Sequence, residues 1–477
     1  MDQLPVELLQ RVLTHLDIET LRSAALSCRL VFGAFRGAEE LITGAALVRQ
    51  IDRRVLPEAI LVQEAREGLG TASVGKGIEF FTKNPGRGRE SAAAAVPTRR
   101  RKRWSLAAAL TLVRFHAKVG HLAAQAAREA LARRPGLLVA GQPDGPTRAE
   151  RCRFELAVYR FELYCNVVGR LWSADGWAIW DMFFRHFALW ELEQLACIHE
   201  YFVRVVSRPF NFLVDHDVTW GYLEVPYIDQ HVSEHAEALL AEGVNKIYSL
   251  SRASGYAECR ALLSRGEDRN GEPARLRRFL GLALQEAGNL NLIPPCALED
   301  MSAPLVALVA GHPFRCNLND DDYDDDDDDD PGPSDMWAWV NRAREPGELV
   351  ADPDARVHRA WAFPFWDVAR LRAAGLLRRE NLDLGLDLDD DDRDRDYAIP
   401  GFGFWRWRRN RLELELGRDF GAPERLAWLE DTQRERAAIW HAGGRGYYAP
   451  GDQSRVEWTG GAGRDRPQVV VVPPWRR

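Results

Sequence analysis

A glycine-rich segment is the first place in this sequence where residue types and spacing could support chemistry. Residues 70–77 read GTASVGKG, which is close to a phosphate-binding loop. That loop needs Ser or Thr after the lysine to hold magnesium, with a strand before it and a helix after it. Here Gly77 replaces the hydroxyl residue, and the residues before it have helical spacing. We therefore do not expect a nucleotide site at this position.

Histidine and aspartate residues could bind a metal ion at two places. His231 and His235 lie four residues apart on a predicted helix, so both rings could face one ion. Glu234 does not stand where a zinc-peptidase motif needs it, and no third ligand is evident. The run Asp215–Asp217 is too short to orient three ligands together, and we predict a loop there after Pro209. We expect exposed histidines and no metal site.

Acidic residues are concentrated in two tracts. Residues 320–330 contribute ten negative charges, and residues 383–396 contribute a net charge of −6. Since the whole chain carries −8, the remainder of the chain carries +8. The first tract is not predicted to be a calcium-binding loop, because Pro331 occupies the position where that loop requires a glycine. We predict solvated, self-repelling acidic loops.

Basic residues form two clusters that could contact nucleic acid. One is a possible nuclear localisation signal or an ordinary solvated charge run, and consists of Arg99, Arg100, Arg101, Lys102 and Arg103. The other, Trp405–Arg411, mixes aromatic and guanidinium groups as single-strand binding platforms do. The acidic tract at 383–396 lies close in sequence, so we expect intramolecular pairing to win. Nucleic acid is therefore not the expected partner.

Enzyme chemistry has no support in this sequence. We find no nucleophile elbow, no Cys–His signature and no glycosidase-like pair of carboxylates. Seven scattered cysteines without a CxxC pair indicate reduced thiols in the cytoplasm or the nucleus. No apolar run is long enough to span a bilayer. We expect a protein without catalysis, cofactor, metal or membrane segment.

The elements themselves are predicted to be helices, beginning with a patterned unit at residues 4–42. Pro5 suits the first position of a helix, and an apolar stripe follows it. Asp17 is a suitable N-cap for a second helix, and a third helix around residues 30–36 should end at Gly37. A bundle of about 40 residues cannot cover all of its apolar side chains. An exposed apolar face therefore implies a partner.

This N-terminal pattern resembles the F-box, a helical module that docks on the Skp-type adaptor of cullin–RING ubiquitin ligases. The resemblance rests on the string LPVELLQRVLTHLDIETLRSAALSCRLVFGAFR at residues 4–36, in which Phe32 stands one place later than the usual aromatic and Ser27 replaces a common aliphatic residue. It implies adaptor contacts by Leu4, Pro5, Leu8, Leu9, Val12, Leu13, Leu16, Cys28, Arg29 and Phe32, with Leu8, Leu9 and Leu13 as the strongest.

The remainder of the chain is predicted to be a larger helical body. Phe154, Val158, Phe161, Cys165, Val168 and Trp172 have helical spacing, and further helices are expected at about 104–134, 190–207, 229–264 and 273–288. Residues 158–166 and 190–201 are similar to segments of filamentous-fungal F-box-like proteins. We predict a mainly α protein with a three-helix F-box-like module (1–45), a helical body (46–312) with a linker at about 71–103, and an irregular region (313–477) with acidic tracts, Gly/Pro-rich loops and Trp-rich ordered pieces.

The expected function is that of a non-catalytic, substrate-recruiting subunit of an SCF-type ubiquitin ligase. Its partners would be the Skp-type adaptor, the cullin complex and an unknown protein target. Two alternatives remain open. The chain could be an interaction scaffold without ligase coupling, which the shifted Phe32 would allow. It could also be a nuclear protein that associates with nucleic acid through the two basic clusters.

Overall fold

The structure, a computed structural model, describes ten parts of the chain: residues 4–69, 104–138, 144–167, 183, 187–225, 227–228, 234–263, 330–341, 358–377 and 423–458. Within these ranges helices dominate, and the two strands form one antiparallel pair. The prediction of a mainly α fold is confirmed. Several predictions lie outside the described residues: the linker, the glycine-rich segment, Arg99–Arg103, His231, the helix at 273–288, residues 320–329, residues 383–396 and Trp405–Arg411.

The N-terminal pattern forms the predicted helices: α1 (Val6–Thr14), α2 (Ile18–Ala25) and α3 (Arg29–Gly37). Asp17 caps α2 as expected, since its carboxylate accepts a hydrogen bond from the Thr20 amide at 2.7 Å. Pro5 lies at the N-cap of α1, one position earlier than predicted. We call residues 4–50 the N-terminal module, because a fourth helix, α4 (Glu39–Gln50), packs on α1 and runs through the predicted boundary at residue 45.

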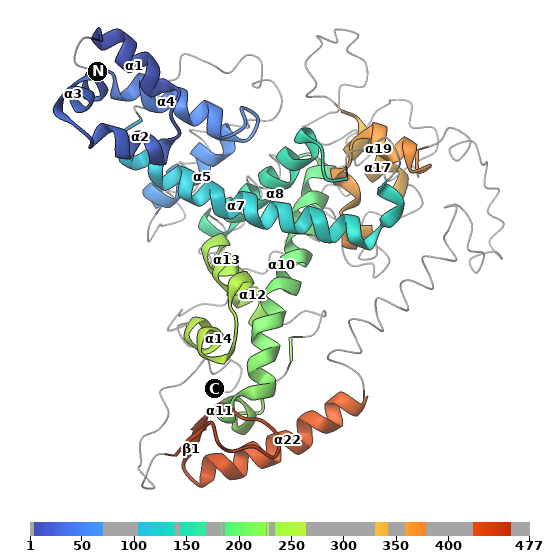
Figure 1. The fold of residues 1–477 in the computed structure, drawn as a ribbon. Coiled ribbons are helices and arrows are strands. Elements are labelled where there is room, and N and C mark those ends of the chain that lie inside the picture. The colour runs from blue at the N-terminus through green and yellow to red at the C-terminus, as the bar shows by residue number, and fades with distance from the viewer. Residues whose placement is uncertain are drawn as a thin grey trace, which may run out of the picture.

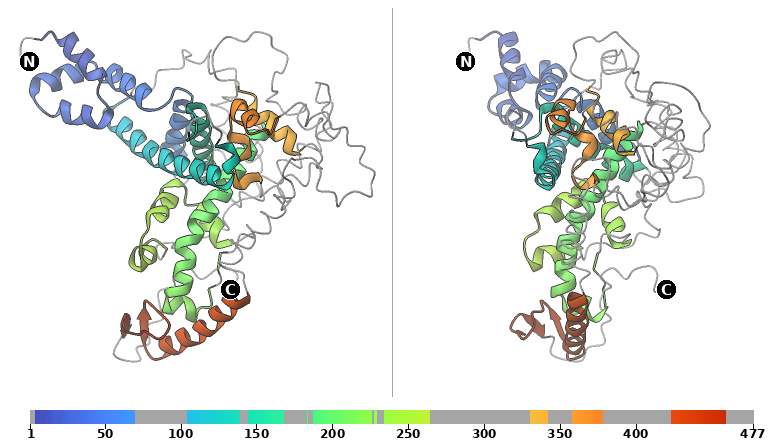
Figure 2. Two further views of the ribbon diagram at one scale, coloured as in Figure 1. Left: turned by 45° about the vertical axis from the view of Figure 1, so that its right-hand side comes forward. Right: turned by 90° about the vertical axis from the view of Figure 1, so that its right-hand side faces the viewer.

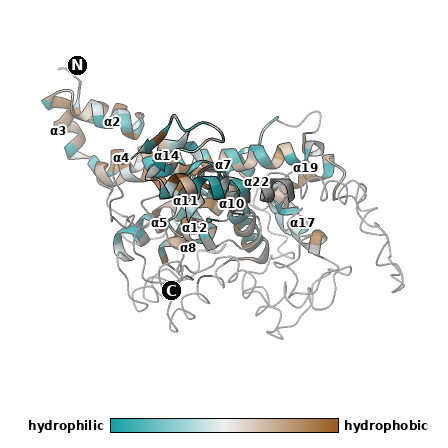
Figure 3. Ribbon diagram, turned by 90° about the horizontal axis from the view of Figure 1, so that it is seen from below, coloured by the Kyte–Doolittle hydropathy of each residue, from teal (hydrophilic) through white to brown (hydrophobic). Residues whose placement is uncertain are grey.

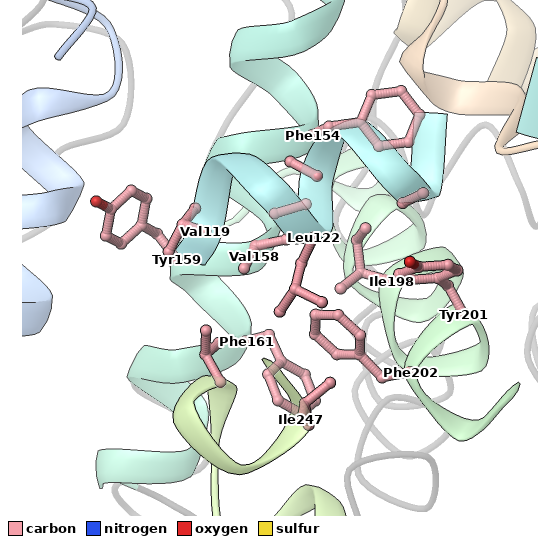
Figure 4. Packing of buried hydrophobic residues seen from close by; sticks show 14 of the residues in the cluster. Val119, Leu122, Phe154, Val158, Tyr159, Phe161, Ile198, Tyr201, Phe202 and Ile247 are labelled. Carbon is pink, nitrogen blue, oxygen red and sulfur yellow. The ribbon is translucent and has the colours of Figure 1, made fainter. Parts of the chain in front are cut away.

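Three long helices form the body behind this module (Figure 1). They are α7 (Leu106–Arg133), α8 (Arg148–Val167) and α10 (Leu189–His216), and α5 (Leu56–Leu69) packs beside α8. Val119 and Leu122 of α7 meet Val158 and Phe161 of α8, with Phe202 of α10 below them (Figure 4). The spacing predicted for α8 is confirmed up to Cys165, and Val168 and Trp172 lie outside the described residues.

Smaller elements complete the body. The short helices α12 (Glu234–Leu240), α13 (Val244–Arg252) and α14 (Tyr256–Leu263) pack against α10. Tryptophans 337, 339, 361 and 366 are buried around α17 (Gly332–Asn341), η3 (Phe363–Phe365) and α19 (Val368–Ala373). The short turn η1 (Pro135–Leu137) follows α7 and contacts α19. Part of the predicted irregular region therefore belongs to the main hydrophobic core.

The far end of α10 holds a separate unit formed by α11 (Val218–Tyr222), α22 (Pro423–His441), β1 (Gly444–Gly446) and β2 (Val456–Trp458). It has its own small core around Trp440 and Tyr448. The N-terminal module and this C-terminal unit lie at opposite ends of the molecule (Figure 2).

The helix α10 corrects one sequence prediction. Pro209 was expected to end the helix, but α10 continues to His216. The segment of α10 after Pro209 is held in the core by two buried side chains, Phe210 and Leu213. The run Asp215–Asp217 therefore stands at the end of a helix and not in a loop, and Asp217 caps α11 through the Trp220 amide at 2.9 Å.

Candidate protein-interaction surface

Exposed apolar side chains are concentrated in the N-terminal module. Among the described residues, nine of the eleven large hydrophobic side chains that are exposed lie between residues 4 and 48. These nine are Leu4, Val6, Leu8, Val12, Leu26, Leu30, Phe32, Leu41 and Val48. Soluble proteins expose single apolar residues commonly, whereas nine within one module make this module the candidate interaction surface.

The helix α1 divides its apolar stripe between two roles. Leu9 and Leu13, four residues apart, are 5% and 4% exposed and pack inside the module. Leu8 and Val12, one position earlier in each turn, are 48% and 56% exposed. Of the three strongest adaptor contacts expected from the sequence, only Leu8 is therefore available to a partner. Leu9 and Leu13 support the helix that presents it.

The other residues implied by the F-box resemblance are also divided. Leu4, Pro5, Cys28, Arg29 and Phe32 are exposed, with 47% of Phe32 accessible to solvent. Leu16 is only half-exposed and packs against the main core. The structure thus keeps Leu4, Leu8, Val12 and Phe32 as exposed apolar groups on α1, the residues before it and α3.

Sequence reasoning missed the contribution of α4. Leu41 and Val48 are seven residues apart and so share one face of this helix, and both are exposed. The opposite face packs Ile42, Ala46 and Leu47 into the core. The spacing of apolar residues on two faces of α4 could have predicted this contribution. It was missed because α4 begins after residue 36, where the segment that resembles the F-box ends.

Within the described residues, the contacts between the module and α7 of the body come from α2 and α4. Glu39 of α4 accepts a hydrogen bond from the Leu106 amide of α7 at 3.0 Å, and Arg114 of α7 pairs with Glu19 of α2 at 2.8 Å. These contacts cover α2 and α4 where they face α7. Figure 3 shows α2, α3 and α4 extending from one end of the molecule, so their outer side remains accessible.

Hydrogen bonds hold the helices of the module in a fixed arrangement. The side chain of Gln10 in α1 donates to the Ala34 carbonyl of α3 at 3.0 Å, and Gln50 of α4 accepts from the Ile18 amide of α2 at 2.8 Å. Arg49 of α4 donates to the carbonyls of Thr14 and Leu16, which close the end of α1. The apolar surface is therefore preformed, which lowers the entropy cost of binding.

Exposed charges of both signs lie on the helices that carry these apolar side chains, including Glu7 on α1 and Glu40 on α4. Arg11 on α1 and Arg29 on α3 are exposed, and neither makes an ion pair within the described residues. Glu7 is the one exposed acidic residue in the first turn of α1. Exposed charges at the rim of an interface mainly steer association and select partners by complementarity.

The groups considered for chemistry have structural partners. Asp215 accepts a hydrogen bond from the Tyr227 hydroxyl, and His216 contacts the Tyr448 carbonyl at 3.1 Å. His235 was expected to be exposed, but it is 8% exposed and packs beside the ring of Phe210. Burial raises the pKa of the Cys152 thiol to about 12, which disfavours the reactive thiolate. The described parts of the chain contain no group of three potential metal ligands.

Comparison with known proteins assigns no function to this chain, so its interpretation depends on the geometry described above. None of the helices in the described ranges is long and apolar enough to cross a bilayer. The chain matches no protein-family model, no curated protein and no solved structure.

Proposed function

We propose that this chain is a substrate-recruiting subunit of an SCF-type cullin–RING ubiquitin ligase, and that its N-terminal module docks on a Skp-type adaptor. The observation that supports the proposal is the concentration of exposed apolar side chains in the same module whose sequence resembles the F-box. Full burial of one such side chain contributes about 1.5–3 kcal/mol. Burial of several would offset an association cost of about 4–15 kcal/mol.

The proposed mechanism is proximity. The adaptor holds the module at one end of the molecule, and the body behind it presents a protein target. Bringing the target close to the conjugating enzyme raises its effective concentration there. The chain itself supplies no acid, base or nucleophile in this mechanism.

The test is a pull-down of the full chain with a purified Skp-type adaptor. Leu8→Asp combined with Val12→Asp places two charges on the exposed stripe of α1 while Leu9 and Leu13 stay in the core. We expect adaptor binding to weaken by more than about tenfold, because truncation of central anchors commonly costs 2 kcal/mol or more. Circular dichroism should show unchanged helix content.

The matched control is Leu138→Asp, which charges an exposed leucine outside the module. It should bind the adaptor like the unmodified chain. Adaptor binding that survives the double substitution on α1 would contradict the proposal. An unmodified chain that does not bind the adaptor at all would contradict it as well.

A scaffold function without ligase coupling is the second candidate. Two observations favour it: Leu9 and Leu13 are in the core and unavailable to an adaptor, and Phe32 is shifted by one position from the aromatic of the F-box pattern. Purification of the complex distinguishes the two functions. Adaptor that co-purifies together with a cullin supports the ligase function, whereas adaptor without any cullin supports the scaffold.

A further inference from the structure

Three arginine side chains surround a single carboxylate where the side chains of α7 and α10 meet. Arg133 comes from the last turn of α7, and Arg204 and Arg208 come from the middle of α10. Glu129 of α7 is the carboxylate between them. We call these three arginines the arginine cluster; it has an excess of two positive charges over Glu129.

Glu129 fixes two members of the cluster in place. One of its oxygens accepts hydrogen bonds from Arg133 Nε at 3.2 Å, Arg133 Nη2 at 2.9 Å and Arg204 Nε at 2.8 Å. Arg208 Nη2 lies 3.9 Å from the other oxygen. Burial alone would raise the pKa of Glu129, but Arg204 and Arg133 lower it below its usual value, so the carboxylate stays ionised.

Donor groups of the cluster remain unused. A guanidinium has five N–H donors, and Arg204 uses only its Nε on Glu129, so both of its terminal nitrogens have no hydrogen-bond partner within the described residues. Those nitrogens are not sealed from solvent. Arg208 is 75% exposed.

Neighbouring groups neutralise only part of this charge. Two carboxylates, Glu193 and Glu200 of α10, share the single buried Arg359. The end of α7 contributes a partial charge of only about −0.5. Burial, and to a smaller extent repulsion from Arg204, lower the pKa of Arg133 to about 10, while Glu129 opposes both effects. An additional anion would relieve this repulsion.

A crevice beside Arg204 offers space next to the cluster. It is lined by Ala126 and Ala130 of α7, by Cys197 and Tyr201 of α10, and by Arg359. The Tyr201 ring lies 5.9 Å from the Arg204 guanidinium. The crevice has room for about one water molecule, so a ligand would bind on the exposed side of the arginines.

We propose that the arginine cluster binds a phosphate monoester group. The three guanidinium groups lie around one carboxylate and do not follow a stripe, which fits a compact dianion better than the extended backbone of a nucleic acid. Planar guanidinium groups match phosphate oxygens in pairs. The proposal does not depend on the adaptor docking of the N-terminal module, since the two sites share no residue.

Calorimetric titration of the full chain tests this site with two probes: inorganic phosphate and a short peptide that carries one phosphoserine. We expect the peptide to bind, and Arg208→Gln to weaken that binding by about tenfold or more, since a charge-assisted hydrogen bond contributes strongly. Arg208 is exposed, so the fold should survive. Arg204→Lys should weaken binding too, because it keeps the charge but removes the planar fork.

The control is Arg22→Gln, which removes an exposed arginine of α2 and should leave binding unchanged. Equal affinity for phosphate and phosphopeptide identifies the free anion as the ligand, and tighter peptide binding identifies a phosphorylated protein; both support the site. Absence of binding, binding that the cluster variants do not weaken, or binding of an oligonucleotide but of neither phosphate probe would overturn it.

Discussion

The Glu155 side chain on α8 lies in a partly closed space beside α7. Its carboxylate is close to Gly120, where an added methyl group would lie 3.7 Å from Oε1. Burial raises the pKa of Glu155 to about 7, the negative charge of Asp52 adds to this effect, and Arg151 opposes it. His116, one turn earlier on α7, cannot compensate, because burial lowers its pKa to about 4 and it is neutral at pH 7.

Glu155 therefore predicts a pH dependence of stability. The folded chain holds the Glu155 proton more tightly than the unfolded chain, whose pKa is about 4.5. The contribution to stability is fully present below the unfolded pKa and is lost as the pH rises towards 7 and above. We expect Glu155→Gln to raise the free energy of unfolding, relative to the unmodified chain, by up to about 3 kcal/mol at pH 8 and by little at pH 4. Urea denaturation at both pH values measures the difference, and equal differences at both would contradict the prediction.

Single residues also show how far the sequence could lead towards the candidate site. The spacing of Leu8, Leu9, Val12 and Leu13 correctly predicts a helix with a wide apolar stripe. It does not determine which half of the stripe faces inward, because that depends on where α3 and α4 lie. The arginine cluster was missed for the same reason: Arg133 and Arg204 are far apart in sequence and are joined only by the packing of α7 and α10.

At the scale of elements, α10 shows how packing overrides a local signal. Proline inside a helix removes a backbone hydrogen bond and costs about 3 kcal/mol. Beyond Pro209, the side-chain amide of Asn211 exchanges hydrogen bonds with the backbone of Ile228 at 2.8 and 3.0 Å, and Leu213 is buried. These long-range contacts have no signature in a local window, so the sequence predicts the start of α10 but not its end.

The contact between α11 and α22 gives a second prediction. A methyl group at Gly221 of α11 would overlap the buried Arg436 side chain of α22. We expect Gly221→Ala to destabilise the C-terminal unit by about 1–3 kcal/mol, as overpacked cores usually do. Hydrogen exchange of α22 measures this loss.

The control for this substitution is Gly33→Ala in α3, where nothing lies within 4 Å of the added methyl group. It should stabilise the helix by up to about 1 kcal/mol, because alanine loses less backbone entropy than glycine. If both substitutions change the protection of α22 equally, the overlap with Arg436 is not the cause.

At the scale of the whole molecule, the two proposed sites are structurally separate. The exposed apolar side chains belong to the N-terminal module, and the arginine cluster lies in the body, where α7 meets α10. No hydrogen bond or ion pair within the described residues joins the cluster directly to α1 or α3. Two sites without a direct contact between them should bind two partners additively.

Additivity is the third prediction. We expect the affinity for the Skp-type adaptor to change by less than about twofold when the phosphopeptide is present at saturation, since coupling between allosteric sites is typically fivefold or more. Titration of the adaptor with and without the peptide measures the coupling, and a change of fivefold or more would contradict the prediction.

The buried Arg436 side chain has a consequence for the synthesis of the protein. It donates to the Val214 carbonyl at the end of α10, and these two residues are 222 positions apart. A ribosome that adds about 5–20 residues per second needs about 10–45 s to cover that interval. During this time the nascent chain carries the last turn of α10 without its guanidinium cap. A product released early by a stop codon before residue 436 would lack this donor, so the Val214 carbonyl at the end of α10 would need another hydrogen-bond partner.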